Sequence, residues 1–490
     1  MSAPLVTLKR RSEQFISDDR RVITRLFIVG DETRVRGLLR RILNMSEPEV
    51  ERNLRIVLND FAARHRDVRA VFDHHFDAVA HLLDNGRQMT EARRWLIGAY
   101  FTMEYAIEAA ALFNPSIVPH FDQTGLPPGA RRYILSLRAT GEGHISSIVF
   151  RVCVIDSAGD IAVNPPSAFV AGGRPDPSAS LAKHTFFLKL IEMGAYTEMA
   201  GRILDPLPDH FIQADLDHTI ARLRESGLRS HEFEEAAQHV TWLARSNYTI
   251  RFAADTPPSE VVIFPVTDNE SRGIEDARFV LFTDDDAKVS YYGTYTAYNG
   301  FRILPQLLTT DDFRTFRIMT LHGKCVQNKG MALFPRKLDG QFVMISRLDG
   351  ENLHLMRSDN IRFWNDAVTL RGPTLDWEYV QIGNCGSPIE TEHGWLLLTH
   401  GVGPMRRYCI GADLLDLDDP TRVIAIARQP IISPDARERE GYVPNVVYSC
   451  GAVVHNNLLV IPYGLSDSAT SFATVPLNDL LSYLRDECRS

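Results

Sequence analysis

Apolar residues recur at helical spacing in the first quarter of the chain. The segments VRGLLRRILNM, EVERNLRIVLNDFAARH and VRAVFDHHFDAVAHLL place them at positions i, i+3, i+4 and i+7, the pattern of an amphipathic helix. Ser46 followed by Glu47 and Pro48 is a typical helix start, because serine caps and proline suits the first turn. The pattern predicts a helical N-terminal domain over residues 1–112, of which residues 1–30 are extended or irregular.

Short apolar strands replace the helical pattern from FNPSIVPH, residues 113–120, onward. They predict a β-domain over residues 113–480, followed by a C-terminal tail over residues 481–490. Helical spacing returns within this domain over residues 180–246, in segments such as HEFEEAAQHVTWLARSN. We therefore expect a helical insertion within the β-domain.

A strand with a polar or glycine-rich tip occurs five times. The last four copies are spaced by about 50 to 65 residues, and the helical insertion explains the longer gap after the first. A period near 50 residues is typical of a β-propeller. The chain is therefore predicted to be mainly β, a five-bladed propeller with the insertion after the first blade; the alternative is a β-sandwich or two unrelated sheets. The copies are RYILSLRATGEGH, VSYYGTYTAYNG, QFVMISRLDG, GWLLLTHGVG and NLLVIPYGLSD.

Polar side chains stand at the ends of these repeated strands. In a propeller the innermost strands surround one axial funnel, so Arg138, Arg347, His400 and Asp467 are expected to face one pocket. Charged side chains at the mouth of apolar strands are costly unless a polar or anionic ligand binds there. The repeats therefore predict a binding site for such a ligand.

Charge and cysteine content narrow the class of partner. The formal net charge of −9 gives no general attraction to nucleic acid or anionic membrane, so neither is expected as a partner. No run approaches 18 apolar residues, and the basic start has no apolar stretch behind it, so neither a membrane span nor a secretory signal is expected. Six scattered cysteines without a CxxC pair predict reduced thiols in a cytoplasm and no metal site.

The motif SRGIEDARF, residues 271–279, is the sharpest local signal. It places Glu275 and Asp276 side by side between Arg272 and Arg278. Adjacent residues of an extended strand point to opposite faces, so one acid can face the funnel while an arginine holds the other. The alternative is a surface ion-pair cluster, which such runs usually are.

Seven ordered motifs give the chain a family resemblance. It resembles glycoside hydrolase family 130, the β-mannoside phosphorylases and β-mannosidases, over about residues 113–155 and 248–480. The N-terminal helical domain and the insertion lie outside the resemblance. The motifs are GIEDAR, YTAYNG, QNKGMALFP, MISR, IGNCGSPIETEHGWLLLTHGV, CIGADLLDLDDPTRVIA and PNVVYSCGAVV.

The resemblance implies that Asp276 is the catalytic acid, although Ala277 stands where the family usually has proline. It also implies a phosphate site formed by Lys329, Arg347 and His400, since phosphate needs cations and donors. Gln381 stands where the phosphorylases have a fourth basic residue. That substitution removes one positive charge and bears on the choice between phosphate and water as the nucleophile.

The same resemblance implies contacts to the mannose that is cleaved. Asparagine, aspartate and arginine suit vicinal hydroxyls because they form paired hydrogen bonds. Glu142 and His144, in the loop after the first repeated strand, are further candidates, with solvent-exposed loop residues as the alternative. The substrate-binding residues expected are Asn114, Ser116, Arg138, Glu275, Arg278, Tyr298 and Asp467.

Three functions follow from these residues. The first is an inverting β-mannoside phosphorylase, in which one carboxylate suffices because inorganic phosphate is the nucleophile and no other cofactor is needed. The second is an inverting β-mannosidase, which needs a second carboxylate; Glu378 and Glu390 are nearest in sequence. The third is a non-catalytic sugar-binding propeller. The linkage, β-1,2 or β-1,4, stays open, and we expect a homo-oligomer because helical appendages need a surface to pack on.

Overall fold

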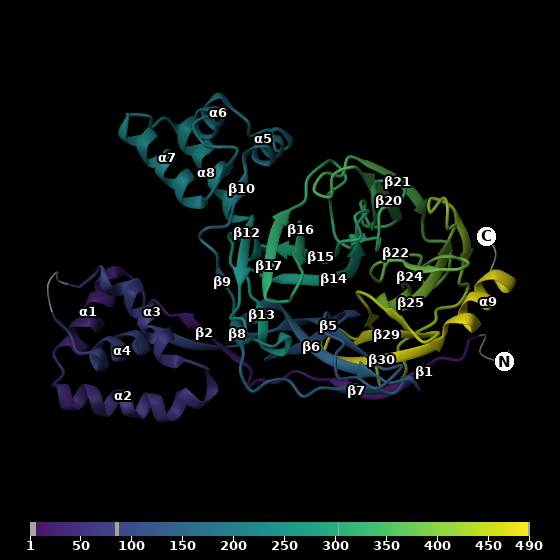
Figure 1. The fold of residues 1–490 in the computed structure, drawn as a ribbon, viewed down its shortest axis with the longest axis horizontal. Helices are drawn as coiled ribbons and strands as arrows, with labels where there is room; N and C mark the ends of the chain where they lie inside the picture. Colours follow the sequence, from purple (N-terminus) through teal and green to yellow (C-terminus); the bar gives the residue numbers. More distant parts are fainter. Residues whose placement is uncertain (1–5, 84–87, 302, 489–490) are drawn as a thin grey trace.

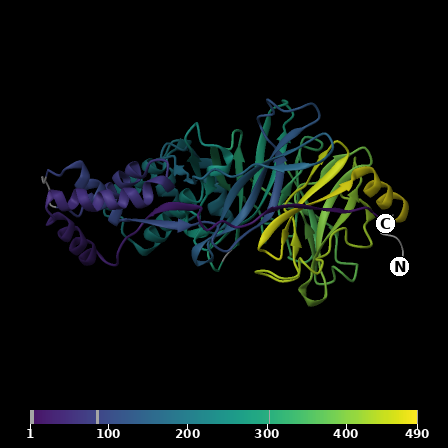
Figure 2. The same cartoon turned by 90° about the horizontal axis from the view of Figure 1, so that it is seen from below.

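The computed structural model of the protein describes residues 6–83, 88–301 and 303–488. The fold is mainly β, with two separate groups of helices beside a body of five sheets (Figure 1). Seen from below, the two groups of helices lie toward one end of an elongated molecule, and the last strands with the C-terminal helix lie at the other (Figure 2). Among the described residues, no helix is long and apolar enough to cross a membrane.

Four helices form the N-terminal group. Asp31 and Thr90 cap two of them, each accepting a hydrogen bond from a backbone N–H of the first turn, and the Glu49 carboxylate accepts one from the backbone N–H of Ser46. A two-stranded sheet, β2 with β3, joins this group to the sheets. The elements are β2 (Val22–Leu26), α1 (Glu32–Leu43), α2 (Glu47–Phe61), α3 (Val68–Ala80), α4 (Glu91–Tyr100) and β3 (Thr102–Ala106).

The first described strand lies far from these helices. Strand β1 (Lys9–Phe15) pairs antiparallel with β30 (Ala469–Pro476), near the other end of the chain. The predicted domain over residues 1–112 is therefore corrected: residues 9–15 belong to the last sheet, and β4 begins at Ala111. A strand of mostly charged residues, KRRSEQF, carries no hydrophobic alternation. Residues 1–5 and 84–87 of that predicted domain lie outside the described residues.

Strands of two sheets, sheet 1 and sheet 2, flank the insertion in the sequence. Strand β13 of sheet 1 follows the insertion in the chain, while β9 and β12 on either side of it join sheet 2. The insertion therefore interrupts sheet 1 and does not follow a completed first blade. Sheet 1 contains β4 (Ala111–Pro119), β5 (Arg131–Thr140), β6 (Ser146–Ile155), β7 (Ile161–Val163), β8 (Ala171–Gly172) and β13 (Val261–Ile263). Sheet 2 contains β9 (Arg174–Pro175), β12 (Tyr248–Arg251), β14 (Ile274–Thr283), β15 (Val289–Tyr298), β16 (Ile303–Thr310) and β17 (Thr315–Thr320).

The insertion is a helical unit with its own core. Phe186, Phe211 and Phe233 are almost completely buried within it. Its residues account for the long sequence gap between the first and second repeated strands. The elements are β10 (Leu181–Ala182), α5 (Lys183–Glu192), α6 (Glu198–Leu204), β11 (His210–Phe211), α7 (Gln213–Glu225) and α8 (His231–Arg245).

Three more sheets complete the body. Sheet 3 contains β18 (Ala332–Leu333), β19 (Phe342–Ser346), β20 (Leu353–Ser358) and β21 (Asp366–Arg371). Sheet 4 contains β22 (Gln381–Asn384), β23 (Ile389–Thr391), β24 (Gly394–Val402), β25 (Tyr408–Leu415) and β26 (Val423–Ile426). Sheet 5 contains β1, β27 (Val447–Tyr448), β28 (Val453–His455), β29 (Leu458–Leu465) and β30.

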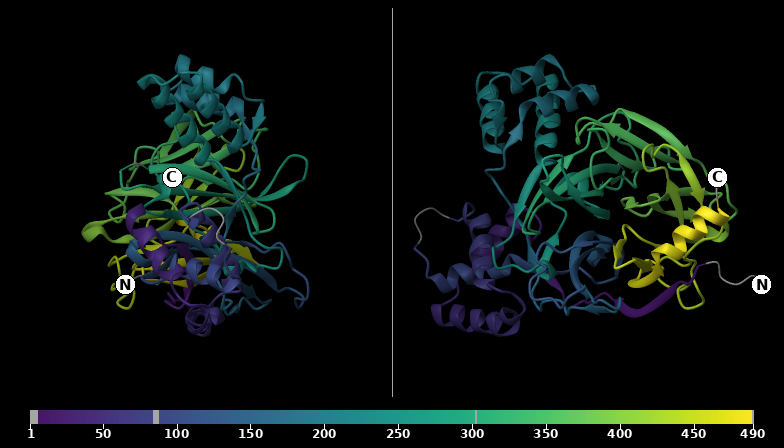
Figure 3. Two further views of the ribbon diagram at one scale, coloured as in Figure 1. Left: turned by 90° about the vertical axis from the view of Figure 1, so that its left-hand side faces the viewer. Right: turned by 45° about the vertical axis from the view of Figure 1, so that its right-hand side comes forward.

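The five sheets contact one another in order. Strand β4 contacts β14 of sheet 2, β15 contacts β18, β19 contacts β22, and β25 contacts β27 of sheet 5. Strand β29 of sheet 5 then contacts β4, so the last sheet lies against the first (Figure 3). The five repeated strands of the sequence are β5, β15, β19, β24 and β29, each the second strand of its sheet beside a first strand at the sheet edge.

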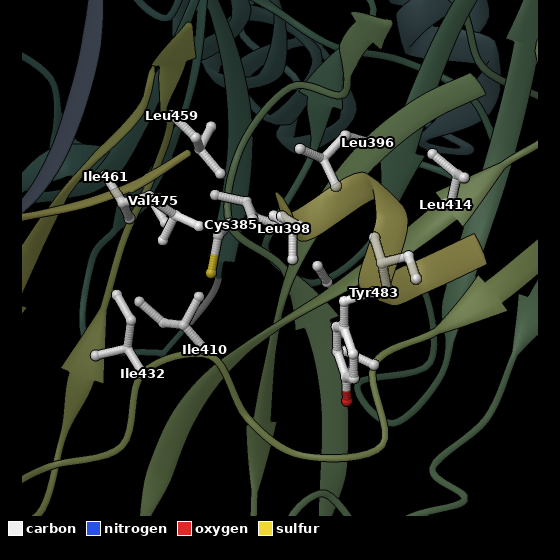
Figure 4. Packing of buried hydrophobic residues seen from close by; sticks show 14 of the residues in the cluster. Cys385, Leu396, Leu398, Ile410, Leu414, Ile432, Leu459, Ile461, Val475 and Tyr483 are labelled. Atoms are coloured by element: carbon white, nitrogen blue, oxygen red, sulfur yellow. The ribbon is translucent and has the colours of Figure 1, made fainter. Parts of the chain in front are cut away.

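The chain ends in a helix that packs on the body. Helix α9 (Leu477–Glu487) buries Leu480, Leu481 and Leu484 against sheets 4 and 5. Figure 4 shows its Tyr483 in one apolar cluster with Leu396 and Leu414 of sheet 4. The predicted tail over residues 481–490 is thus corrected up to residue 488, because its apolar residues recur at helical spacing; residues 489–490 lie outside the described part.

Candidate active site

Glu275 and Asp276 lie on β14 at an irregularity of the strand. The pairing register with β15 shifts between Glu275 and Arg278, and Asp276 has a left-handed backbone with φ of 56°. The expectation that the two acids point to opposite faces is wrong. Arg138 reaches both, with its Nη2 2.8 Å from Glu275 Oε1 and its Nη1 3.7 Å from Asp276 Oδ1. A bulge breaks the two-residue alternation of a strand, which explains the difference.

A second bulge faces the first. Strand β4 shifts its register between Phe113 and Ser116, and Asn114 there also has a left-handed backbone, with φ of 49°. The Asn114 side chain donates a hydrogen bond of 2.6 Å to Asp276 Oδ1. Left-handed residues other than glycine cost energy and cluster at functional sites, so this pair of bulges marks the centre of the site.

Positive charge surrounds the Asp276 carboxylate. Burial raises the pKa of Asp276, but the charges of Arg138, Arg278 and Lys329, with the Asn114 hydrogen bond, outweigh burial and lower it below its usual range. The carboxylate is therefore ionised at neutral pH while the site holds no anion. An anion bound among these cations would raise its pKa again.

Lys329 is the partner of the other acid. Its Nζ lies 2.5 Å from Glu275 Oε2, so Glu275 is held by Lys329 and Arg138 together. Gly330 follows with φ of 85°, and a Cβ there would lie 3.8 Å from Cβ of Arg347. Lys329 thus contacts the Glu275 carboxylate, and the next residue in the chain, Gly330, lies beside Arg347.

Arg278 holds the backbone of the bulge. Its Nη1 donates to the carbonyl of Asp276 at 2.8 Å, and its Nη2 donates to the Tyr448 hydroxyl at 2.7 Å. Arg278 is 3% exposed, which suits a residue that positions Asp276 better than one that contacts sugar. Tyr448 was not singled out in the sequence, because an aromatic residue in a strand usually belongs to the core.

Arg347 and His400 form the second half of the site. Arg347 Nη1 lies 3.4 Å from His400 Nε2, and the His400 ring packs against the rings of Tyr408 and Tyr448, which also pack against each other. Burial, and then the charges of Arg347 and Arg278, lowers the pKa of His400 well below its usual value. His400 was expected as a basic residue; the structure makes it a neutral hydrogen-bonding group.

Gln381 reaches the site through a neighbour. Its Nε2 lies 3.5 Å from the hydroxyl of Tyr408, whose ring stacks at 18° to that of His400. Gln381 is on the strand paired with β24, two residues before Gly383, which lies opposite His400. In the described structure, Gln381 therefore contacts Tyr408, and Tyr408 in turn stacks on His400.

Asp467, Ser116 and Tyr298 were predicted to contact sugar, and the structure places each in a different environment. Burial, and then the negative charge of Asp276, raises the pKa of Asp467 to about 7, so the charges of these two carboxyl groups interact. Ser116 is fully buried, and its Oγ accepts a hydrogen bond of 3.0 Å from the backbone N–H of Phe279, so it joins β4 to β14. The Tyr298 hydroxyl donates to the carbonyl of Gly300 in its own turn.

Neither carboxylate suggested as a second acid is available. Glu378 is fully buried and paired with Arg371 at 2.7 Å, while Glu390 pairs with Arg336 at 2.6 Å. Both partners neutralise the charge that a general base would use. Within the described ranges, no group of three or more histidine, cysteine or acidic residues could hold a metal ion.

The chain belongs to glycoside hydrolase family 130. The family model described as beta-1,4-mannooligosaccharide phosphorylase matches residues 231–486, just over half of the 490-residue chain. That match includes Asp276, Lys329, Arg347 and His400. The strands of Asn114, Ser116 and Arg138 precede it, so their roles rest on the contacts described above.

Curated relatives are phosphorylases. The chain is 34% identical over 225 residues to a 1,2-beta-oligomannan phosphorylase of Thermoanaerobacter sp., covering 44% of this chain and 72% of that one. It is 30% identical over 256 residues to a beta-1,2-mannobiose phosphorylase of Listeria innocua, covering 50% and 69%. A solved structure of the Listeria innocua enzyme with beta-1,2-mannobiose aligns with a TM-score of 0.46 at 22% identity, over 77% of this chain and 93% of that one.

Proposed function

We propose that the protein is an inverting β-mannoside phosphorylase. It cleaves β-1,2- or β-1,4-linked manno-oligosaccharides with inorganic phosphate and releases α-mannose 1-phosphate and a shortened sugar. The observation that carries this proposal is the contact of Asp276 with Asn114 and Arg138 next to the pair formed by Arg347 and His400. An acid, a sugar-binding amide and an anion site stand together there.

The reaction balances with one protein carboxyl group. An oxygen of phosphate forms a bond to the anomeric carbon, and the glycosidic C–O bond on the opposite face breaks. The leaving oxygen takes a proton that comes from Asp276. The family resemblance implies that this proton passes through a hydroxyl of the bound mannose. Because bound phosphate adds negative charge beside Lys329, it raises the pKa of Asp276 and favours its protonated form.

Arg347 and His400 are the residues proposed to hold phosphate, with Lys329 at their side. Arg347 supplies a charged fork and neutral His400 supplies one donor or acceptor. Gln381 is proposed to support His400 through Tyr408, whose ring stacks on that of His400. Asn114, Arg138 and Asp467 are proposed to hold the cleaved mannose, Glu275 to orient Arg138 and Lys329, and Arg278 and Ser116 to fix the strands; Tyr298 stays a predicted contact.

A hydrolase on the same fold is less well supported. It needs a second ionised carboxylate to activate water. Glu378 and Glu390 are paired with arginines, Glu275 is held by two cations, and Asp467 gives up its proton only near pH 7. Phosphate avoids this need because it is itself the nucleophile.

The arrangement of the sheets supports a five-bladed propeller, because each sheet contacts the next and the fifth contacts the first. The N-terminal helical group and the insertion are proposed as separate units on one side of it. The six cysteines are free and buried, in keeping with the expected cytoplasmic location. That location, a homo-oligomeric state, and the absence of nucleic-acid and membrane partners stay predictions.

One incubation tests the proposed function. The purified protein is mixed with β-1,2- or β-1,4-mannobiose, with and without inorganic phosphate, and mannose 1-phosphate and mannose are measured. We expect mannose 1-phosphate that depends on phosphate, and the productive disaccharide identifies the linkage. Free mannose at the same rate without phosphate would establish a hydrolase instead. No product from either disaccharide would leave a sugar-binding protein.

A further inference from the structure

An exposed aromatic pair lies beside the candidate active site. The hydroxyl of Tyr442 lies 3.1 Å from Nδ1 of His144, and the two rings stand 5.8 Å apart. Tyr442 keeps 52% of its surface exposed, and His144 is exposed as well. Large aromatic side chains usually gain stability from burial, so a ring that is fixed by a hydrogen bond and still open to solvent suits a ligand contact.

The two residues extend the elements that carry the sugar side of the site. His144 lies in the turn from β5 to β6, and Arg138 of β5 bonds to Glu275. The backbone N–H of Tyr442 donates to Ser468 Oγ at 2.7 Å, directly after Asp467 in the chain. The His144–Tyr442 pair therefore connects the turn that follows β5, the strand of Arg138, to the turn between β29 and β30, which contains Asp467.

The backbone around the pair is tightly specified. Gly143 and His144 both have left-handed conformations, with φ of 65° and 61°. A Cβ at Gly441, next to Tyr442, would stand 2.5 Å from the carbonyl oxygen of Ser466. Such conformations persist only where the surroundings impose them, and they cluster at binding sites. The pair is thus held in place before any ligand arrives, which lowers the entropic cost of binding.

The geometry of an inverting displacement says what this pair faces. The nucleophile and the leaving group stand on opposite faces of the anomeric carbon. The proposed phosphate residues Arg347 and His400 come from sheets 3 and 4. In contrast, His144 lies in a turn of sheet 1, and Tyr442 lies just before β27 of sheet 5. The leaving sugar therefore lies toward sheets 1 and 5.

We propose that the His144–Tyr442 pair binds the leaving sugar unit and so sets which acceptors the enzyme uses. This inference rests on the proposed phosphorylase function. The Tyr442 ring packs against the C–H face of the pyranose, and the second ring nitrogen of His144 bonds to a sugar hydroxyl. The same residues bind the acceptor when the reaction runs in reverse.

Kinetics in the direction of synthesis test the pair. Wild type, Tyr442→Ala, Tyr442→Phe and His144→Ala are given α-mannose 1-phosphate with mannose or mannobiose as acceptor. We expect the acceptor KM to rise about tenfold in Tyr442→Ala, and less in Tyr442→Phe and His144→Ala, while the KM for α-mannose 1-phosphate stays within twofold. The matched control is Tyr100→Ala, since Tyr100 on α4 is 42% exposed.

Two results would overturn the pair's role. One is an unchanged acceptor KM in Tyr442→Ala and His144→Ala, and the other is an equal rise in the KM of the sugar phosphate. Calorimetric binding of β-1,2- and β-1,4-mannobiose separates this inference from the proposed reaction. If wild type binds a disaccharide but forms no product from it when phosphate is present, the phosphorylase function fails, and weaker binding by Tyr442→Ala still supports the pair. Equal binding by both proteins, or none by wild type, rejects it.

Discussion

Asn114 donates a 2.6 Å hydrogen bond to Asp276 Oδ1 across two facing strand bulges. The amide fixes one carboxylate oxygen, while Arg278 fixes the carbonyl of the same residue at 2.8 Å. Asp276 is thus oriented from its side chain and from its backbone. A proton donor gains rate from such orientation because small displacements of reacting groups are costly.

The first prediction concerns this hydrogen bond. Asp276→Asn removes the acid, and we expect the rate of phosphorolysis to fall about 10³-fold. Asn114→Ala leaves Asp276 in place but removes the hydrogen bond that orients its carboxylate. We therefore expect kcat to fall about tenfold to a hundredfold. Mannose 1-phosphate release is the measurement, with Asn164→Ala in an exposed loop as the matched control. Wild-type rates in Asp276→Asn would refute the assigned acid.

The second prediction concerns phosphate binding without turnover. Ligands that bind only the folded state stabilise it, by about 2.7 kcal/mol at a hundredfold excess over Kd. We expect inorganic phosphate to raise the Tm of the wild type and to leave Arg347→Gln unchanged. The change leaves a shorter, uncharged polar side chain and removes the charge that faces His400.

Potassium chloride at equal ionic strength is the control for that measurement, because exposed charges respond to salt in general. Arg20→Gln is the control variant, since Arg20 pairs with Asp18 on the surface. A rise of Tm with phosphate that persists in Arg347→Gln would place the anion elsewhere. The same outcome would weaken the argument that favours a phosphorylase over a hydrolase.

The sequence singled out Asp276, Lys329, Arg347 and His400 because they stand in long ordered motifs, and their roles stay predictions. It also predicted the repeated strands β5, β15, β19, β24 and β29, whose apolar runs end in polar tips. It could not predict the bulge at Asp276, because neither Asp276 nor Ala277 signals a left-handed turn as glycine does. The convergence of Glu275 and Asp276 on Arg138 follows from that bulge alone.

Other features were hidden for a different physical reason. Strand β1 pairs with β30 across more than 450 residues of chain, and its charged sequence lacks the alternation of a half-buried strand. Tyr448 and Tyr442 read as ordinary aromatic residues until the structure places one under Arg278 and the other against His144. Long-range pairing decides such roles, and no local pattern encodes it.

The third prediction concerns the space beside His400. A Cβ at Gly383 would stand 2.4 Å from Cε1 of the His400 ring, so Gly383→Ala must displace that ring. We expect kcat/KM for phosphate to fall about 10²-fold, while the KM for mannoside changes little. The control is Gly172→Ala, because an added Cβ at Gly172 has no neighbour within 4 Å among the described residues. Unchanged phosphate kinetics in Gly383→Ala would show that the position of His400 is unimportant.

The fourth prediction concerns the pH dependence of stability. Burial and the charge of Asp276 raise the pKa of Asp467 to about 7, against 3.8 for an ordinary aspartate. Between these two values the folded protein keeps a proton that the unfolded chain has released, so its stability falls as pH rises through this window. Asp467→Asn removes the titration and keeps a side chain of the same shape.

We therefore expect the Tm of Asp467→Asn to gain on that of the wild type as pH rises from 4 to 7, and the gap to level off above pH 7. Its full size corresponds to about 4 kcal/mol, from about three pKa units. Asp176→Asn is the control with the opposite sign: hydrogen bonds from Ser178 and Arg251 lower the pKa of Asp176 from 3.8 to about 2, so the wild type should gain on that variant as pH rises from 2 to about 4, with a constant gap at higher pH. A gap for Asp467→Asn that does not vary with pH would mean that Asp467 is ionised throughout, and its charge would then face Asp276 during the reaction.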